Sequence, residues 1–278
     1  MNDSTRITVI MATYNCAKYL DECFTSILNQ TYENFVVKII DDCSSDDTVS
    51  FVEKWAQKDK RIQFLGIHEE NKGLTVTLNE LLEEVDTELV ARMDADDACL
   101  PQRFEKQVEF LDAHPNVSIV GTWAEDFDDD GNFIKVRKVP IKHEDIRKMI
   151  IKASPMIHPS VMMRTKDVKS IGGYDTRFRV AQDINLWYRF LGAGLTMANI
   201  PEIHMKYRVN PNHAKKRSFK HRMLDAKIRI GGTKLIKASL LERITAVSIP
   251  LVLGIMPAGI TKLILKYSEK IDPRQKIK

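Results

Sequence analysis

The sequence predicts an α/β fold, a mostly parallel twisted sheet flanked by helices, with a helical and basic extension at the C-terminal end. Short apolar runs and amphipathic helical patterns alternate along about the first 120 residues. That alternation is typical of a parallel sheet covered on both faces. Polar and acidic residues directly follow most of the apolar runs. They therefore lie at the carboxyl ends of the strands, where such folds bind ligands.

Each predicted strand is a short run of apolar and β-branched residues. The five runs occupy residues 7–12, 35–40, 62–67, 88–93 and 117–123. The helices between them are indicated by apolar residues three or four positions apart. These residues are Leu20, Phe24, Ile27 and Leu28; Val49, Val52 and Trp55; Leu74, Leu78, Leu81 and Leu82; and Phe104, Val108 and Leu111. Ser45 and Asp46 are N-cap candidates for the second helix, and Pro101 is the predicted first residue of the fourth.

The second half of the chain has a less regular pattern. Residues 128–132, Asp-Asp-Asp-Gly-Asn, are typical of a hairpin turn. Ile184, Trp187, Tyr188 and Leu191 lie at helical spacing and predict an amphipathic helix. Trp187 is therefore expected in the core.

Composition and charge narrow the class of protein. The 278 residues are 44% hydrophobic and 29% charged, which suits a folded protein. The net charge of +4 hides an asymmetry, because residues 206–278 carry 18 Lys and Arg against 4 Asp and Glu. Such a tail fits an anionic membrane or a nucleic acid. It has few aromatic residues for stacking bases, so we expect no nucleic-acid partner.

The cysteines do not have the spacing of a zinc site, and the N-terminal residues do not form a signal peptide. The four cysteines form no C-x-x-C pair and have no paired histidines nearby, so reduced thiols are expected rather than a zinc site. Reduced thiols are typical of the cytoplasm. The apolar run at residues 7–12 is too short for a signal peptide or a membrane span.

Asp94, Asp96 and Asp97 crowd the end of the fourth predicted strand. Carboxylates this close together repel one another unless a cation or hydrogen-bond donors neutralise them. Hard oxygen ligands suit Mg²⁺ or Mn²⁺ shared with phosphates. The sequence therefore predicts a divalent-metal site at this edge of the sheet.

Seven stretches, in the family's order, resemble the family 2 inverting glycosyltransferases, which have the Rossmann-like nucleotide-sugar A-type fold. They are VIMATYN at 9–15, IDDCSSDDT at 40–48, NKGLTVTLN at 71–79, RMDADD at 92–97, HPS at 158–160, GGYD at 172–175 and AQDINLWYR at 181–189. They span about three quarters of the chain. The resemblance implies a catalytic domain over residues 1–210, with a donor-binding half up to about residue 98 and an acceptor half over 99–210. The helical basic region covers residues 211–278.

The resemblance also implies roles for single residues. Tyr14 and Asp42 resemble the nucleoside contacts, one beside the base and one accepting a hydrogen bond from it. Lys72, in the NKG stretch, is assigned to the donor site as well. Asp94 and Asp96 resemble the D-x-D pair, which holds the metal and the donor's ribose or phosphates.

Asp183 resembles the catalytic base of the family. A carboxylate on the opposite face of the sugar can deprotonate the acceptor hydroxyl, and a helix N-terminus favours its ionised form. The family commonly has Glu-Asp where this chain has Gln182-Asp183, which keeps the base and removes one negative charge. The alternative role for Asp183 is a simple N-cap. His158, in the HPS stretch, is a weaker candidate for the lining of the donor pocket.

The resemblance implies transfer of one sugar, with inversion, from a UDP-hexose or UDP-N-acetylhexosamine to an acceptor hydroxyl, with Mn²⁺ or Mg²⁺ as cofactor. By analogy, the acceptor is an oligosaccharide, preferably lipid-linked, in O-antigen or capsule-type polysaccharide synthesis.

Three other protein classes are alternatives to this one. A nucleotidyltransferase should carry a glycine-rich basic loop after the first strand, and a processive synthase should carry Q-x-x-R-W and several membrane spans. Neither pattern is present. Intact Asp94, Asp96 and Asp183 argue against an inactive sugar-binding module.

Residues 244–261 form an uncharged stretch interrupted by Pro250, Gly254, Pro257 and Gly259. Prolines leave backbone groups unpaired in lipid, so a broken interfacial helical pair is favoured over a span. Basic residues flank the stretch, at Lys215, Lys216, Arg217, Lys220, Arg222, Lys262 and Lys266. We expect a cytoplasmic protein docked on the anionic inner face of the cell membrane. Packing of the stretch on the catalytic domain and a true span are the alternatives.

Overall fold

The computed structural model describes residues 5–209 and 219–255. Its strands are β1 (Ile7–Thr13), β2 (Phe35–Asp41), β3 (Ile62–Ile67), β4 (Leu89–Arg92), β5 (Ala98–Cys99), β6 (Val117–Phe127), β7 (Phe133–Arg137), β8 (Met162–Arg164) and β9 (Thr196–Arg208). Its helices are α1 (Ala17–Leu28), α2 (Thr48–Lys58), α3 (Leu74–Glu83), α4 (Arg103–Ala113), α5 (His143–Met149), α6 (Thr165–Ser170), α7 (Gln182–Gly192), α9 (Phe219–Leu235) and α10 (Leu240–Ile255), with one 3-10 turn, η1 (His158–Ser160).

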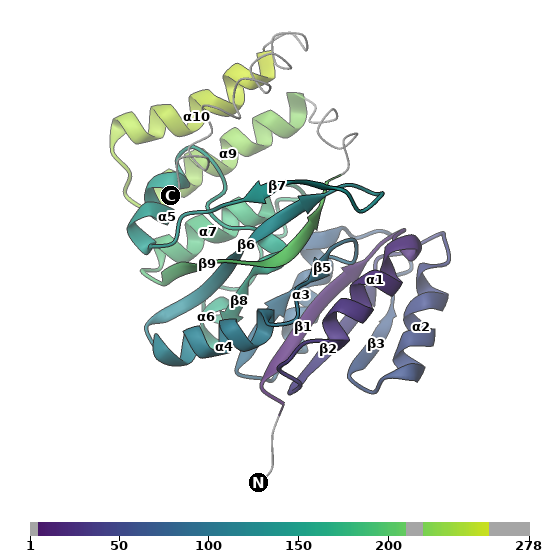
Figure 1. The fold of residues 1–278 in the computed structure, drawn as a ribbon. Helices are drawn as coiled ribbons and strands as arrows, with labels where there is room; N and C mark the ends of the chain where they lie inside the picture. The colour runs from purple at the N-terminus through teal and green to yellow at the C-terminus, as the bar shows by residue number, and fades with distance from the viewer. Residues whose placement is uncertain (1–4, 210–218, 256–278) are drawn as a thin grey trace.

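These strands form one sheet in the order β3-β2-β1-β4-β8-β6-β9-β5, and β7 pairs with β6 (Figure 1). β1 to β4 pair in parallel, as predicted for the first half of the chain. The second half is mixed, because β6 and β9 are parallel whereas β8, β5 and β7 run antiparallel to their neighbours. The α/β class is confirmed, and the parallel part of the sheet is the part that carries the predicted nucleotide contacts.

Helices cover both faces of the sheet. Along β1, Val9 and Met11 pack into one core cluster with side chains of α1, α2 and α4. Ile10, between them, packs into the second cluster with side chains of α3, α6 and α7. Alternate strand residues point to opposite faces, so the near-continuous apolar runs of the sequence reflect burial on both sides.

The N-cap of α2 is Asp47, so the prediction that Ser45 or Asp46 would be the N-cap is wrong. α2 begins at Thr48, and the N–H of Thr48 donates to Asp46 Oδ1 at 3.0 Å. Asp46 Oδ2 accepts a second hydrogen bond, at 3.2 Å, from the N–H of Ala17 at the start of α1. Asp46 therefore stabilises the starts of two helices. Pro101 lies in a turn two residues before α4, so it precedes that helix rather than beginning it.

The predicted hairpin turn joins β6 to β7. Asp128 Oδ1 accepts hydrogen bonds from the N–H of Asp130 and Asn132, at 3.0 and 2.8 Å. A carboxylate that binds the backbone further along the chain is the usual way an Asp closes such a turn.

The described part of the C-terminal region packs on the α/β domain. α9 lies across α7, and the Arg229 guanidinium donates to the carbonyl oxygens of Ile150 and Ile151 at 3.1 and 3.2 Å. Ala246 of α10 is fully buried, and Glu242 pairs with Arg147 at 3.0 Å. α10 therefore packs on the α/β domain, which was one of the alternatives for residues 244–261.

No helix among residues 5–209 and 219–255 is long and apolar enough to cross a bilayer. Residues 256–261 lie outside the described residues. So do most of the predicted basic flanks, namely Lys215, Lys216, Arg217, Lys262, Lys266 and the side chain of Lys220.

Two adjacent glycines of α9 provide a test of this packing. A Cβ atom added to Gly232 would lie 2.2 Å from Tyr188 Cγ, whereas a Cβ on Gly231 would meet nothing within 4 Å. We expect Gly232→Ala to lower the free energy of unfolding by about 1–3 kcal/mol. Gly231→Ala should raise it by up to about 1 kcal/mol, because alanine favours the helix. Urea denaturation measures both. Equal effects of the two substitutions would mean that α9 does not pack on Tyr188.

Candidate active site

The carboxyl ends of β1 and β2 place Tyr14 and Asp42 side by side. Thr13 pairs with Asp41 in the parallel register, and the N–H of Asp42 donates to the carbonyl oxygen of Thr13 at 2.8 Å. The Tyr14 side chain is 52% exposed, so its ring is free to lie against a planar ligand. Sequence reasoning predicted this meeting of strand ends.

Asp41 and Asn15, to which the sequence assigned no role, hold the loop after β2. Buried Asp41 accepts hydrogen bonds from Thr13 Oγ1 at 2.8 Å and from Ser44 Oγ at 2.6 Å. Asn15 has a φ of 48°, and its Oδ1 accepts the N–H of Ser45 at 2.8 Å. Asn tolerates this left-handed conformation better than most residues. The two strand-end loops are therefore locked to each other.

Asp42 is buried and already accepts three hydrogen bonds. His68 Nδ1 lies 2.8 Å from Oδ1, the N–H of Lys72 donates to Oδ1 at 2.9 Å, and the N–H of Gly73 donates to Oδ2 at 2.8 Å. A carboxylate offers about four acceptor positions. One position on Oδ2 therefore remains for a further donor, and the side chain also fixes the loop that carries Lys72.

Sequence reasoning missed His68 and Glu80. Glu80 Oε2 lies 2.6 Å from His68 Nε2, and Glu80 Oε1 accepts from Lys72 Nζ at 3.0 Å. Burial alone would raise the pKa of Glu80, but the hydrogen bonds from His68 and Lys72 outweigh it and hold that pKa below its usual value. His68 directly follows β3, so the rule that polar residues at strand ends form the site would have found it.

Asp94, Asp96 and Asp97 form the predicted acidic cluster. One oxygen from each carboxylate lies within 4.8 Å of the others. Arg92, which is almost fully buried, binds both oxygens of Asp94, with Nη1 2.5 Å from Oδ2. Burial and the charge of Asp94 raise the pKa of Asp96 to about 6, and the same two causes raise the pKa of Asp97 well above its usual value.

Arg208, at the end of β9, closes this cluster from the other side. Its N–H donates to Asp97 Oδ1, and its Nε donates to the carbonyl oxygen of Asp96, both at 2.8 Å. Asp97 Oδ2 is buried and has no hydrogen-bond partner among the described residues. Crowded carboxylates with raised pKa values and an unsatisfied oxygen fit a hard divalent cation. The residues present are thus suited to Mg²⁺ or Mn²⁺.

Asp183 lies in the first turn of α7, whose N-cap is Ala181. The simple N-cap role is therefore wrong, since the helix begins one residue before Asp183. Ser154 Oγ donates to Asp183 Oδ2 at a long 3.4 Å. Asp183 and Asp94 line the same cavity of about 710 Å³. The structure thus brings the predicted base to one cavity with Asp94, one of the two predicted metal ligands, whereas Asp96 and the predicted donor contacts Tyr14, Asp42 and Lys72 are not among the residues that line it.

Helices α9 and α10 form part of the wall of this cavity. The wall residues they contribute are His221, Arg222, Asp225, Arg229, Ile249 and Pro250. Lys152, just after α5, lines it too. The region predicted to follow the catalytic domain therefore helps to build the site, because it folds back over α7.

His158 lines the cavity and is buried. Its Nε2 lies 2.8 Å from the hydroxyl oxygen of Tyr174. Burial, with a smaller effect of the Arg92 charge, lowers the pKa of His158 well below its usual value, so the ring is neutral at pH 7. His204 is buried beside Glu202, and Trp187 is fully buried in the core, as predicted.

Comparison with known proteins finds a family model and similar glycosyltransferases. The family model "Glycosyl transferase family 2" matches residues 8–172. EpsE of Bacillus subtilis, which carries the name of a glycosyltransferase, is 33% identical, and the match covers 99% of this chain and 98% of EpsE. The UDP-Gal:α-D-GlcNAc-diphosphoundecaprenol β-1,3-galactosyltransferase of Escherichia coli is 29% identical over 78% of each chain.

Two solved structures share the fold. Residues 1–349 of TarS from S. aureus, in complex with UDP-GlcNAc, match at a TM-score of 0.66 and 18% identity over 96% of this chain and 88% of that one. The mannosyltransferase PcManGT of Pyrobaculum calidifontis, in complex with GDP-Man and Mn²⁺, matches at 0.62 and 19% identity, over 98% of this chain and 82% of that one.

The raised pKa of Asp96 predicts how stability depends on pH. Because its folded pKa, about 6, lies above the ordinary 3.8, ionisation destabilises the metal-free protein as the pH rises from about 4 through 6. Asp96→Asn should therefore raise the free energy of unfolding at pH 7.5, by up to about 3 kcal/mol, and change it little at pH 4. Thermal melts in EDTA measure this, with exposed Asp86→Asn as the matched control.

Manganese should reverse the ranking at pH 7.5, stabilising the unchanged protein and not Asp96→Asn. An equal effect of Asp96→Asn at both pH values, or equal stabilisation of both proteins by Mn²⁺, would contradict a cation site at this cluster.

Proposed function

This chain belongs to glycosyl transferase family 2, and on that premise we propose that it transfers one sugar, with inversion, from a nucleotide-diphosphate donor to an acceptor hydroxyl. The observation that carries this proposal is the shared cavity of Asp94 and Asp183. A leaving group held on one side and a base held on the other are what an in-line displacement at the anomeric carbon needs.

The donor nucleoside is assigned to the ends of β1 and β2. The exposed Tyr14 ring suits one face of the base, and the remaining acceptor position of Asp42 suits an N–H on its edge. Lys72, whose ammonium pairs with Glu80, lies on the same loop and can reach a phosphate by leaving that exposed pair. We favour UDP-hexose or UDP-N-acetylhexosamine, an assignment that the UDP-GlcNAc complex of TarS supports.

Asp94 and Asp96 are the proposed metal ligands, with Mn²⁺ or Mg²⁺ as the ion. A bound cation would neutralise the charge that develops on the departing diphosphate. Arg92 already engages both oxygens of Asp94, so Asp96 has the freer carboxylate of the two. Asp97, with its unpartnered Oδ2, joins the proposed set. The Mn²⁺ in PcManGT supports this choice of cofactor.

Asp183 is the proposed base. The N-terminal turn of α7 favours its carboxylate form, and the hydrogen bond from Ser154 helps to orient it. The acceptor oxygen would lose its proton to Asp183 as it attacks the anomeric carbon, on the face opposite the diphosphate. Gln182, which also lines the cavity, adds a hydrogen-bonding group without a second charge beside the base.

The proposed acceptor is a lipid-linked oligosaccharide. The diphosphoundecaprenol substrate in the name of the Escherichia coli relative supports this choice. The cavity wall formed by α9, α10 and the segment after α5 carries Lys152, Arg222 and Arg229, of which Arg229 pairs with Asp225 on the same wall. Cationic side chains on that wall suit an acceptor that carries phosphate.

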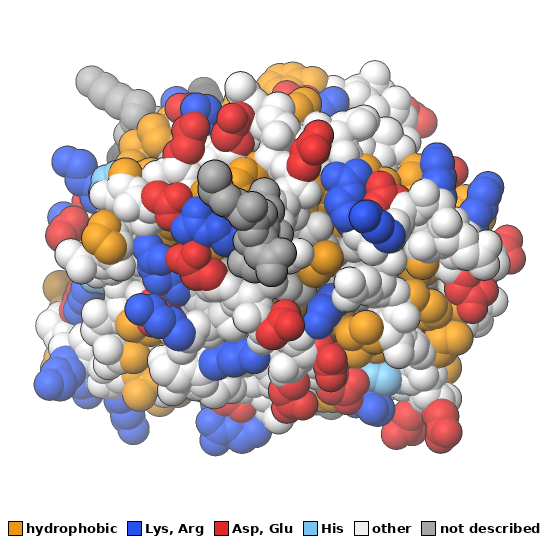
Figure 2. Space-filling view, turned by 90° about the horizontal axis from the view of Figure 1, so that it is seen from below, with side chains coloured by type: hydrophobic (Ala, Val, Ile, Leu, Met, Phe, Trp, Pro, Cys, Tyr) orange, Lys and Arg blue, Asp and Glu red, His pale blue; other side chains and the backbone are white. Residues whose placement is uncertain are grey.

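Docking on an anionic membrane surface would bring such an acceptor to the cavity. Seven exposed large apolar side chains lie on α9 and α10: Met223, Ile230, Leu235, Leu240, Leu241, Ile244 and Val252. Exposed Lys227, Lys234 and Lys237 lie on or just after α9. The face opposite these helices, seen from below in Figure 2, instead intersperses acidic and basic side chains with small apolar areas. We therefore assign the docking surface to α9 and α10, with a cytoplasmic, peripheral location.

Asp183→Asn tests the base. We expect kcat to fall by about 10²-fold or more, the scale of lost general-base catalysis. The affinity for UDP should stay unchanged, because the acceptor is the group that loses a proton. Transfer kinetics and UDP titration measure the two. Asp145→Asn, the same chemical change at an exposed carboxylate of α5, is the matched control. Near-normal turnover of Asp183→Asn would assign the base elsewhere.

A paired substitution tests the docking surface. Leu240 and Leu241 are 74% and 75% exposed. Replacing both by Glu should weaken binding to vesicles of anionic phospholipid by at least about tenfold, since it removes apolar area and adds negative charge. The matched control replaces the exposed neighbours Phe133 and Ile134 of β7 by Glu. Cosedimentation at low salt measures both. Equal losses in the two variants, or no binding by the unchanged protein, would refute this docking surface.

A further inference from the structure

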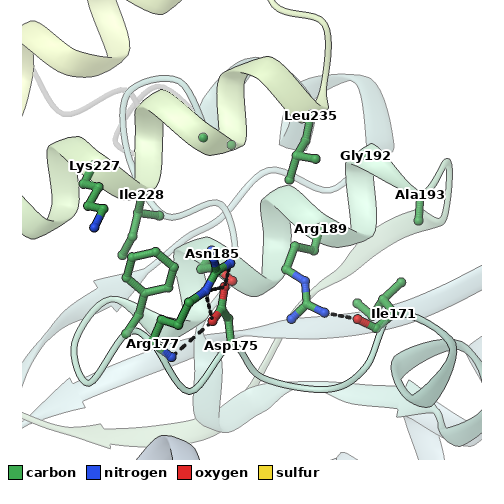
Figure 3. Close-up of a pocket in the computed structure, with 13 residues that line it drawn as sticks. Ile171, Asp175, Arg177, Asn185, Arg189, Gly192, Ala193, Lys227, Ile228 and Leu235 are labelled. Atoms are coloured by element: carbon green, nitrogen blue, oxygen red, sulfur yellow. Dashed lines mark hydrogen bonds and ion pairs between the residues drawn. The ribbon is translucent and has the colours of Figure 1, made fainter.

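A second cavity lies on the other side of α7 from the proposed base. Its volume is about 660 Å³, and it opens between α7, α9 and the loop that follows α6 (Figure 3). It shares no lining residue with the active-site cavity. Asp183 and Asn185 lie two residues apart on α7, so they point about 200° apart around the helix axis. α7 is therefore a common wall between two separate cavities.

Asn185 is the first sign that this cavity takes a ligand. Its side chain is more than nine-tenths buried and lines the cavity. Its Oδ1 has no hydrogen-bond partner among the described residues. A buried amide oxygen without a donor is costly, and a turn of this side chain toward the cavity would let a ligand's hydroxyl group donate to that oxygen.

The charged side chains around the cavity are the second sign. Arg189 is half-buried, and burial lowers its pKa. It donates to the carbonyl oxygens of Ile171 and Gly173. No acidic side chain in the described part of the chain pairs with Arg189 or with exposed Lys227. Asp175, the one acid of the lining, already pairs with Arg177 at 2.6 Å. The cavity therefore has an excess of positive charge, which suits an anion.

Gly231 is the third sign. It lies inside α9, where glycine destabilises a helix by up to about 1 kcal/mol relative to alanine. Nothing lies within 4 Å of the place where its Cβ would be, so no neighbouring group requires a glycine. Gly232 beside it is explained by contact with Tyr188, and Gly192 by contact with Leu235. Gly231 instead leaves the cavity open.

The remaining lining is apolar, from Ile171, Phe178, Ile228 and Leu235. A pyranose has apolar C–H faces and a rim of hydroxyl groups, which match these apolar walls and the amide group of Asn185. A phosphate or carboxylate on the sugar would match Arg189 and Lys227. We propose that this cavity binds an anionic carbohydrate, either a sugar phosphate or an acidic sugar of a polysaccharide, at a site distinct from the active site.

Isothermal titration calorimetry tests the site on the full chain saturated with UDP and Mn²⁺, which keeps the donor site occupied. The probes are glucose 1-phosphate, glucuronic acid, glucose and inorganic phosphate. At least one of the two anionic sugars should bind about tenfold or more tighter than both glucose and phosphate, because it gains a charge-assisted hydrogen bond and the apolar contact together. The anionic sugar that binds more tightly shows whether the ligand is a sugar phosphate or an acidic sugar.

Substitutions on α9 locate the binding. Gly231→Leu should abolish it by filling the cavity, whereas Gly231→Ala should keep it. Lys227→Glu should weaken it by about tenfold or more, whereas Lys234→Glu, an equal charge change on the same helix outside the lining, should not. UDP affinity should be normal in all four variants, which shows that they fold and separates this site from the donor site.

Three results would overturn the proposal. One is no binding of either anionic sugar at millimolar concentration. Another is binding no tighter than that of glucose or of phosphate alone. The third is binding that survives both Gly231→Leu and Lys227→Glu, which would place the ligand elsewhere on the protein.

Discussion

The mutual repulsion of Asp94, Asp96 and Asp97 is the constraint on which the rest of the site depends. Three carboxylates whose oxygens lie within 4.8 Å of one another destabilise the fold unless positive charge surrounds them. The chain supplies Arg92 from β4 and Arg208 from the distant end of β9. β9 must therefore return to the carboxyl end of the parallel strands, and this return brings the second half of the sheet against the first.

The same return of β9 sets the position of the proposed acceptor side. Once β6 and β9 are paired, α7 lies on the sheet with its N-terminal turn, and Asp183, at the cavity that Asp94 lines. α9 then packs on α7 through Gly232 and Tyr188. The cavity that Asp94 and Asp183 share is thus lined by residues from Leu74 of α3 to Pro250 of α10, and α7 separates it from the second cavity.

Hydrophobic spacing and polar residues at strand ends predicted the elements whose formation depends on neighbouring residues in the sequence. The first four strands, their helices and the cluster at Asp94 follow from hydrophobic spacing and strand-end polarity, and the structure has them where they were predicted. Arg208 could not be assigned, because 111 residues separate it from Asp97. The packing of α9 on α7 includes a glycine that faces a tyrosine ring, a contact that no periodicity reveals. His68 directly follows β3 and could have been predicted from the rule that polar residues at strand ends form the site, but it was missed.

In the proposed reaction, the acceptor attacks the sugar from the side of Asp183 while the diphosphate leaves on the side of Asp94. The stereochemistry of transfer tests this most directly. With an α-linked nucleotide sugar as donor, proton NMR of the anomeric signal should show a β-linked product, or the β-anomer released first when water is the acceptor. An α-configured product would contradict the account, since it requires attack from the face of the leaving group.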